Sequence, residues 1–185
     1  CFHGNAKTVA DIRYAMDAGI GLFAADNAVE LDRISAYAKE KGMTQRVLLR
    51  ITPGIDPHTF DAVNTGKVDS KFGSAIVTGQ AMEIVKLALS KKSLDLVGLH
   101  CHIGSQIFDL EPFSDAADIM VRFIADIKRE CAYEIRELNL GGGFGVRYTE
   151  DDREISYSGA IADIAKIVRT FCEKNGIRMP RVILE

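Results

Sequence analysis

The chain has 185 residues, of which 47% are apolar, 8% aromatic and 26% charged, an ordinary composition for a globular domain with a sizeable core. Lys and Arg (23) nearly balance Asp and Glu (26), for a net charge of −3, which argues against a protein that binds nucleic acid by neutralising phosphates. The apolar runs are strand-length, far short of the roughly 20 residues of a membrane span. The four cysteines form no C-x-x-C pair, so we expect a reducing, cytoplasmic setting.

Helical and strand-like patterns alternate along the whole chain. Apolar residues recur at helical spacing, and short apolar runs lie between these segments. Asn27 and Glu30 predict a capping box at the start of the second helix. The predicted helices span residues 7–18, 28–42, 78–90, 111–131 and 157–174, and the predicted strands 20–25, 47–52, 95–100, 135–140 and 181–185.

This alternation predicts an α/β fold with a buried parallel sheet, either an open doubly wound sheet or a (β/α)8 barrel. An open sheet gathers its ligands at one switch point, whereas a barrel collects them from many strand ends. We therefore favour an incomplete (β/α)8 TIM barrel with outer helices, because a full barrel takes about 250 residues. Polar or glycine-rich groups follow the predicted strands at 3–5, 26–27, 50–52, 100–102, 141–143 and 185.

The two ends of the sequence bear on whether it is a complete protein. The chain starts at Cys1 without an initiator Met, and it stops at Glu185, directly after an apolar run that predicts a core strand. We therefore expect these residues to be a piece of a longer protein.

Gly141, Gly142 and Gly143 follow a predicted strand, and adjacent glycines let backbone N–H groups approach an anion such as a phosphate. The run does not fit the dinucleotide-binding fingerprint, because Val146 stands where its third glycine is required. A tight turn after the strand is the alternative explanation.

His100 and His102 alternate on one predicted strand, so both side chains are expected on the same face. They could bind a metal together with carboxylates from other strands, or one ring could stack on an aromatic ligand. A pair of buried, hydrogen-bonded histidines is the third possibility. Ser105 follows closely and adds a hydroxyl that suits a phosphate.

Two charged residues at predicted strand ends have both a ligand-binding and a structural interpretation. Glu185 could pair with a cationic ligand nitrogen, or form an internal ion pair with an arginine such as Arg50. Arg50 itself could contact a ligand or serve only in such a pair. Lys71 lies in a long loop between residues 53 and 77, where a lysine is usually solvated.

Taken together, these motifs resemble the diaminopimelate decarboxylase family, within the pyridoxal-phosphate decarboxylases that have an alanine-racemase-like barrel (fold type III). The HIGSQ and GGGFG motifs indicate the wider group, and the TG-x-x-DSKFG loop indicates the diaminopimelate branch. The matching segments lie at residues 3–7, 50–56, 65–73, 98–107 and 138–145, and the closing VILE is similar to the start of the family's E-P-G-R motif.

The resemblance implies pyridoxal 5'-phosphate as the cofactor and no metal. His102 would stack on the pyridine ring, and Ser105 with the amides of Gly141–Gly143 would hold the phosphate. Glu185 would pair with the ring nitrogen and keep it protonated, and Arg50 would lie at the strand end near the cofactor.

The resemblance also implies that parts of the enzyme lie outside residues 1–185. These residues would form part of the cofactor-binding barrel domain, without the start of the barrel and without the C-terminal β domain. The family's Schiff-base lysine would lie upstream of Cys1, and no lysine of this chain matches its motif. We therefore expect the chain to be inactive by itself, and the full-length protein to be a homodimer.

The leading functional hypothesis is decarboxylation of meso-2,6-diaminopimelate to L-lysine and CO2 by the parent protein. An arginine- or ornithine-type decarboxylase is the near alternative. A metal-dependent barrel hydrolase using His100 and His102 belongs to a different class. A non-catalytic phosphate-binding barrel fits poorly, because of the charged segment at 150–154 and the long DSKFG loop.

Overall fold

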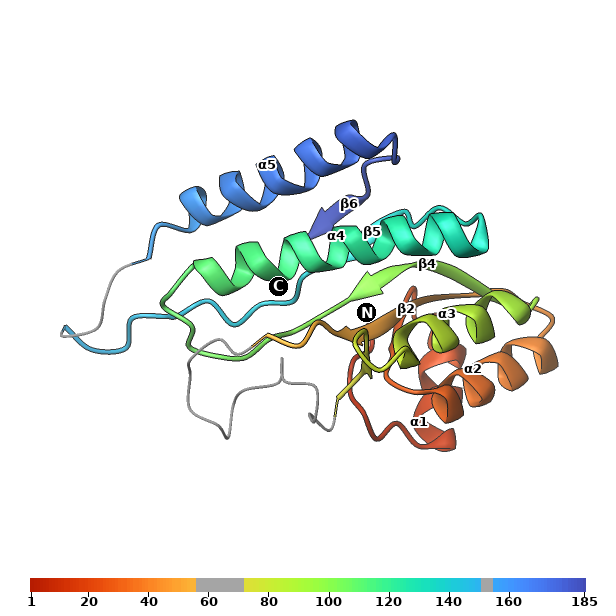
Figure 1. Ribbon diagram of the computed structural model, residues 1–185. Coiled ribbons are helices and arrows are strands. Elements are labelled where there is room, and N and C mark those ends of the chain that lie inside the picture. The colour runs from red at the N-terminus through yellow and green to blue at the C-terminus, as the bar shows by residue number, and fades with distance from the viewer. Residues whose placement is uncertain (56–71, 151–154) are drawn as a thin grey trace.

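The computed structural model describes residues 1–55, 72–150 and 155–185, in which helices and parallel strands alternate (Figure 1). None of the helices in these ranges is long and apolar enough to cross a bilayer. The helices are α1 (Val9–Asp17), α2 (Ala28–Glu40), α3 (Gln80–Ser90), α4 (Glu111–Cys131) and α5 (Tyr157–Asn175). The strands are β1 (Phe23–Ala25), β2 (Gln45–Thr52), β3 (Ser74–Ala75), β4 (Leu94–His100), β5 (Glu137–Asn139) and β6 (Arg181–Ile183).

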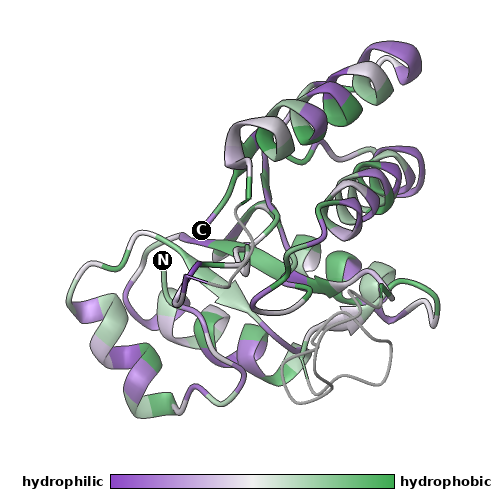
Figure 2. Ribbon diagram, turned by 90° about the vertical axis from the view of Figure 1, so that its left-hand side faces the viewer, coloured by the Kyte–Doolittle hydropathy of each residue, from purple (hydrophilic) through white to green (hydrophobic). Residues whose placement is uncertain are grey.

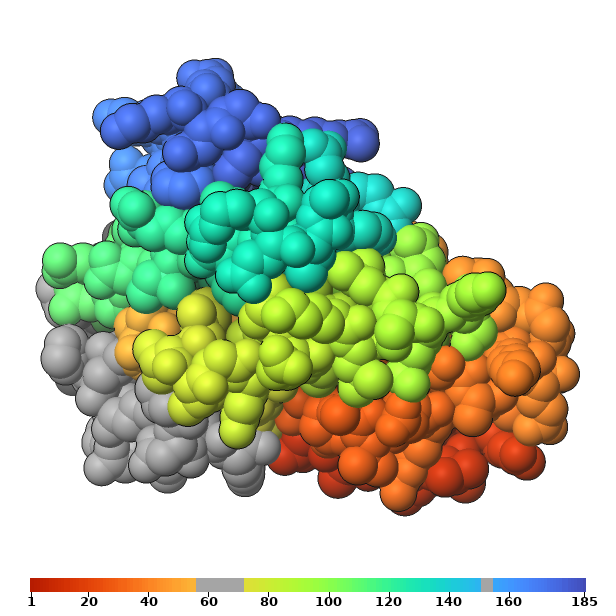
Figure 3. Space-filling view, turned by 45° about the vertical axis from the view of Figure 1, so that its right-hand side comes forward, coloured from red at the N-terminus to blue at the C-terminus, as the bar shows by residue number. Residues whose placement is uncertain are grey.

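The strands form one parallel sheet in the order β1-β2-β4-β5-β6, with the short β3 beside β2. Phe2 adds a parallel bridge to Phe23 outside β1. Because parallel crossovers share one hand, a strand order that never reverses places all helices on one face. The space-filling view agrees, since the chain colours follow one another in order across the outer surface (Figure 3). A doubly wound sheet would reverse its order at a switch point, so this order favours the barrel.

The core lies between the sheet and the helices. Val47, Leu49, Leu99 and Leu138 alternate along the strands toward this layer and are fully buried. The long helix α4 supplies many of the buried side chains facing them, including Phe113. Figure 2 shows the same division, with mostly green strands and with purple turns on the helices. Each such side chain contributes roughly 1.5–3 kcal/mol through burial, so this layer holds the helices on the sheet.

The polar side chains at the starts of α1 and α2 form hydrogen bonds either within the helix start or with a more distant element. Thr8 and Asp11 form the reciprocal capping box of α1. The Asn27 side chain caps α2 as predicted, by accepting from the Glu30 N–H at 2.9 Å. The predicted return bond from Glu30 is wrong, because its carboxylate accepts from the Asp26 N–H and from Lys7 Nζ. A tertiary ion pair thus replaces half of the local motif.

The opposite, inner face of the sheet carries polar residues in rows. Strand register aligns Arg50, His100 and Asn139 across β2, β4 and β5. The pairing of β2 with β4 shifts register between Val47 and Leu48, so one residue of β4 has no partner on β2. After this shift, His100 lies on the inner face. A bulge of this kind re-aims the side chains that follow it.

At the amino ends of the strands, an ion triad lies on the inner face. Glu137 Oε1 accepts from Arg46 at 2.9 Å and from Arg181 at 2.6 Å, so the triad links β2, β5 and β6. Gly98 of β4 pairs with Glu137, and a Cβ there would lie 2.0 Å from the Glu137 carbonyl oxygen. Glycine at this position therefore permits the close contact of β4 and β5.

The structure confirms the predicted helices and the predicted strands, with ends that shift by a few residues. The prediction missed β3, which has only two residues and forms by pairing with the end of β2. Much of the long loop, including Lys71, and most of the charged segment lie outside the described residues.

We expect Gly98→Ala to destabilise the protein by roughly 1–3 kcal/mol, because the new Cβ meets the backbone of β5 and the strands must separate. Gly21→Ala is the matched control, since a Cβ at the exposed Gly21 meets no atom within 4 Å. Urea unfolding of the purified proteins measures the difference. Equal midpoints for the two variants would contradict the role of Gly98.

Candidate functional site

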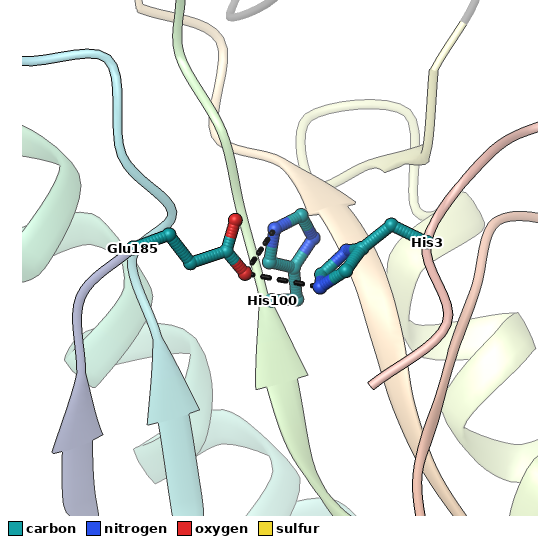
Figure 4. A group of neighbouring side chains, drawn as sticks. All are labelled: His3, His100 and Glu185. Atoms are coloured by element: carbon teal, nitrogen blue, oxygen red, sulfur yellow. Dashed lines mark ion pairs between the residues drawn. The ribbon is translucent and has the colours of Figure 1, made fainter. Parts of the chain in front are cut away.

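One pair of side chains, His3 and Glu185, connects the two edges of the sheet. His3 follows the bridge outside β1, and Glu185 follows β6 at the other edge. These edges are five strand spacings apart, about 24 Å in a flat sheet at about 4.8 Å per spacing. Nevertheless His3 Nε2 lies 3.0 Å from Glu185 Oε1. The sheet must therefore curve around its inner face, as a barrel does, and bring its strand ends together (Figure 4).

Glu185 Oε1 is the point on which several strand ends converge. It accepts a hydrogen bond from Asn139 Nδ2 at 2.8 Å, and His3 Nε2 approaches it from another side. His100 Nε2 lies 3.9 Å away (Figure 4). The Glu185 side chain is 39% exposed, so the carboxylate is held at the mouth and stays accessible.

The histidines beside Glu185 are held neutral by their surroundings. His100 is only 2% exposed, and neither ring nitrogen has a hydrogen-bond partner among the residues that the structure describes. Burial lowers the pKa of His100 well below its usual value, and nearby His3 and Arg50 lower it further. Burial also lowers the pKa of His3, although Glu185 opposes this shift. Glu185 thus faces two imidazole rings that are neutral at neutral pH.

The glycine run is required by close backbone contacts. A Cβ at Gly141 would lie 2.6 Å from the Cys101 carbonyl oxygen, and one at Gly143 would lie 1.9 Å from that of Gly104. Gly141 and Gly143 also have positive φ angles, of 71° and 98°. The Gly141 N–H donates to Asn139 Oδ1 at 2.8 Å, whereas those of Gly142 and Gly143 have no partner within the described part of the chain. Of the three glycine N–H groups predicted to bind an anion, one is therefore already bonded within the protein.

The loop after β4 lies against these glycines. His102 is partly buried, and its ring lies beside Gly141 and Gly143, as the positions of their missing Cβ atoms show. Burial lowers the pKa of His102, which favours an uncharged ring. Ser105 is exposed on the same loop. The predicted site residues from β4 and β5 are thus adjacent.

Arg50 has a partner that the sequence analysis did not name. Its guanidinium lies 3.5 Å from Asp26 Oδ1 and stacks over the Phe72 ring at 4.2 Å. Asp26 also accepts from the Gly73 N–H through Oδ2. The alternative ion pair between Arg50 and Glu185 is therefore wrong, because Asp26 at the end of β1 takes that place.

Lys7 is buried next to the site, yet its ammonium group is fully engaged. Its Nζ donates to the carbonyl oxygens of Gly4 and Ala24 and to Glu30 Oε1. Both side chains of the Lys7–Glu30 pair are at most 3% exposed. This lysine holds the start of the chain against β1 and α2, which is a structural role.

The structure also tests the metal alternative. Among the described residues, the cluster with metal-ligand geometry is His3, His100 and Glu185, whose ligand atoms lie within 4.8 Å of one another. His102 is not part of it, so the predicted pairing of His100 with His102 as metal ligands is not supported. His3 and Asn139 were assigned no role from the sequence, although both stand where a strand ends in a polar residue.

Comparison with known proteins shows the family to which this chain belongs. The profile of the family described as "Pyridoxal-dependent decarboxylase, pyridoxal binding domain" matches residues 1–185. The chain belongs to this family. Diaminopimelate decarboxylase of Bacillus methanolicus is 41% identical over 184 residues, covering 100% of this chain and 43% of that protein. The chain thus spans less than half the length of the curated relatives it matches.

Solved structures of the same family share the fold. The crystal structure of diaminopimelate decarboxylase from Methanocaldococcus jannaschii has a TM-score of 0.88 and 36% identity, covering 100% of this chain and 42% of that one. The Helicobacter pylori enzyme complexed with L-lysine has a TM-score of 0.86 and 28% identity, covering 98% and 43%. The prediction of an incomplete barrel of the alanine-racemase type is confirmed, and the family match confirms the pyridoxal cofactor class.

We expect the cofactor-free protein to lose stability as the pH falls below about 6.5. His100 is neutral when folded because its pKa is lowered, so the unfolded chain binds the extra proton below its ordinary pKa. The loss is roughly 1.4 kcal/mol per pH unit for this histidine. His100→Leu should remove that part of the pH dependence in urea unfolding between pH 7.5 and 5.5. A variant with the wild-type slope would contradict the assignment.

Proposed function

We propose that this chain is the cofactor-binding barrel segment of a diaminopimelate decarboxylase, and that the parent protein converts meso-2,6-diaminopimelate to L-lysine and CO2. The observation that carries the proposal is the convergence of Glu185, His102 and the glycine run at one mouth of the curved sheet. The diaminopimelate decarboxylases at 35–41% identity over nearly the whole chain support the substrate.

The residues present fit pyridoxal phosphate. The N–H groups of Gly142 and Gly143, which have no partner among the described residues, suit a phosphate, and Ser105 is exposed nearby. Glu185 offers a fixed carboxylate on the same side, where a protonated ring nitrogen can pair with it. His102 lies beside Gly141 and Gly143 as a partly buried ring whose lowered pKa favours the neutral form, and it could pack on the cofactor.

When bound, pyridoxal phosphate supplies an electron sink for the pair of electrons left on the substrate carbon when the bond to the departing carboxylate breaks. Glu185 keeps a proton at the ring nitrogen, which maintains that sink. The glycine amides and Ser105 bind the phosphate and fix the position of the ring. His102 supports one face, and Arg50, held by Asp26, adds positive charge at the mouth. Overall, the substrate loses CO2 and takes up one proton from solvent at the same carbon.

The proposal extends to parts of the protein that lie beyond these contacts. We infer that residues 1–185 act within a longer chain that adds the remaining barrel strands, the lysine that carries the cofactor and a C-terminal β domain. The short coverage of the relatives supports this inference. We also infer a cytoplasmic homodimer whose small-molecule partner is an amino acid.

Glu185→Gln in the full-length protein should lower kcat by roughly 100-fold or more, because a neutral amide does not hold the ring proton. Cofactor affinity should change far less, since the phosphate anchors remain. His102→Ala should weaken catalysis and leave the fold intact. Decarboxylation assays and cofactor titrations measure the two effects, and equal rates for wild type and Glu185→Gln would contradict the role of Glu185.

Substrate choice provides a separate test. The full-length protein should release CO2 from meso-diaminopimelate, and much more slowly from L-ornithine or L-arginine, because diaminopimelate decarboxylases match the whole chain at 38–41% identity. A preference for ornithine or arginine would support the sister activity. Stoichiometric zinc without a pyridoxal absorbance band would support the hydrolase and overturn the proposal.

A further inference from the structure

One buried amide side chain connects the two proposed anchor points of the cofactor. Asn139 is 4% exposed and ends β5. Its Nδ2 donates to Glu185 Oε1 at 2.8 Å, and its Oδ1 accepts from the Gly141 N–H at 2.8 Å. The same group therefore contacts the residue assigned to the ring nitrogen and the loop assigned to the phosphate.

We propose that Asn139 is a positioning residue that sets the Glu185 carboxylate relative to the glycine loop, with His3 bracing the same carboxylate oxygen from the other edge of the sheet. The inference rests on the proposed function, in which Glu185 meets the cofactor ring and the loop meets its phosphate. It assigns to Asn139 and His3 a role in orienting Glu185.

The two contacts require a side chain at this position that offers one donor and one acceptor. Glu185 is an acceptor when ionised, so the group facing it must donate, whereas the Gly141 N–H needs an acceptor. Asparagine presents one of each. Because Asn139 and His3 both approach Oε1, the other carboxylate oxygen remains for a ligand. Contacts at Oε1 thus fix the orientation of Glu185, and the other oxygen can bind the ligand.

The surroundings of Asn139 make the bridge rigid. Asn139 pairs with His100 on β4 and with Ile183 on β6, and Glu185 donates its backbone N–H to the Gly141 carbonyl at 2.9 Å. A planar cofactor has a fixed distance between its ring nitrogen and its phosphate. Holding both anchor points on one frame therefore favours the productive position of the ring.

Asn139→Asp separates the two contacts. An aspartate keeps an acceptor for Gly141, but its second oxygen then lies where Nδ2 met Glu185 Oε1. Two carboxylates this close must share a proton. At low pH the shared proton preserves the bridge, and at high pH its loss drives the carboxylates apart. The titratable groups that face this position are His3, His100, His102, Arg50 and Cys101.

The full-length protein loaded with pyridoxal phosphate, labelled with 15N at the ring nitrogen, reports the effect directly. We expect the wild-type 15N shift to show a protonated ring from pH 6 to pH 9, and Asn139→Asp to lose that proton as the pH rises. Its kcat should fall roughly 10- to 100-fold at pH 9 relative to pH 6, the equivalent of one hydrogen bond to a charged group. The cofactor dissociation constant should stay within about threefold of wild type, because the Gly141 contact remains.

His3 provides a second, independent pair of variants. His3→Leu removes the polar contact to Oε1, whereas His3→Gln retains an N–H donor of similar reach. We expect His3→Leu to reduce ring protonation and kcat, and His3→Gln to restore most of both. Circular dichroism checks that each variant folds, and the His3 pair decides the question if Asn139→Asp does not fold.

Wild-type 15N shifts and pH profiles in both Asn139→Asp and His3→Leu would overturn this inference. Loss of ring protonation in Glu185→Gln in the same experiment would show that the proposed function still holds. A wild-type protein that fails to bind pyridoxal phosphate would overturn the proposed function, and this inference with it. The two failures are therefore distinguishable.

Discussion

Glu185 lies at one edge of the sheet, and its Oε1 contacts both a neighbouring strand and the opposite edge. Asn139 reaches it from β5 and His3 from beyond β1, which is possible only because the parallel strands curve into part of a barrel. The curvature in turn depends on unbroken sequential winding, with the helices on the outer face and their apolar sides against the strands. As a result, polar residues of the inner face contact one another at the strand ends.

Much of this arrangement follows from local patterns in the sequence. The spacing of apolar residues specifies α4 and the other helices, and the apolar runs specify the longer strands, because burial on one or both faces dominates their stability. Polar groups after nearly every strand favoured a barrel over a doubly wound sheet. The residues of the HIGSQ and GGGFG motifs do lie together, since the carboxyl ends of neighbouring parallel strands share one edge of the sheet.

Other features depend on contacts that no local pattern records. Arg50 pairs with Asp26, and Glu30 turns from its own helix start toward Lys7, because each partner lies on a different element. The glycine run was explained by anion binding, yet its backbone contacts with the loop after β4 already require glycine. Asn139 was overlooked because an asparagine at a strand end is common, and its value comes from having both a donor and an acceptor satisfied at once.

The triad of Glu137 with Arg46 and Arg181 at the amino ends of the strands has a consequence for access. It joins β2, β5 and β6 across the inner face, at the end opposite to Glu185 and the glycine loop. Charged side chains thus link three strands across that end of the inner face. The two ends of the inner face therefore differ: ion pairs cross-link β2, β5 and β6 at the amino ends, whereas Glu185 stays 39% exposed at the carboxyl ends, where a ligand can reach it.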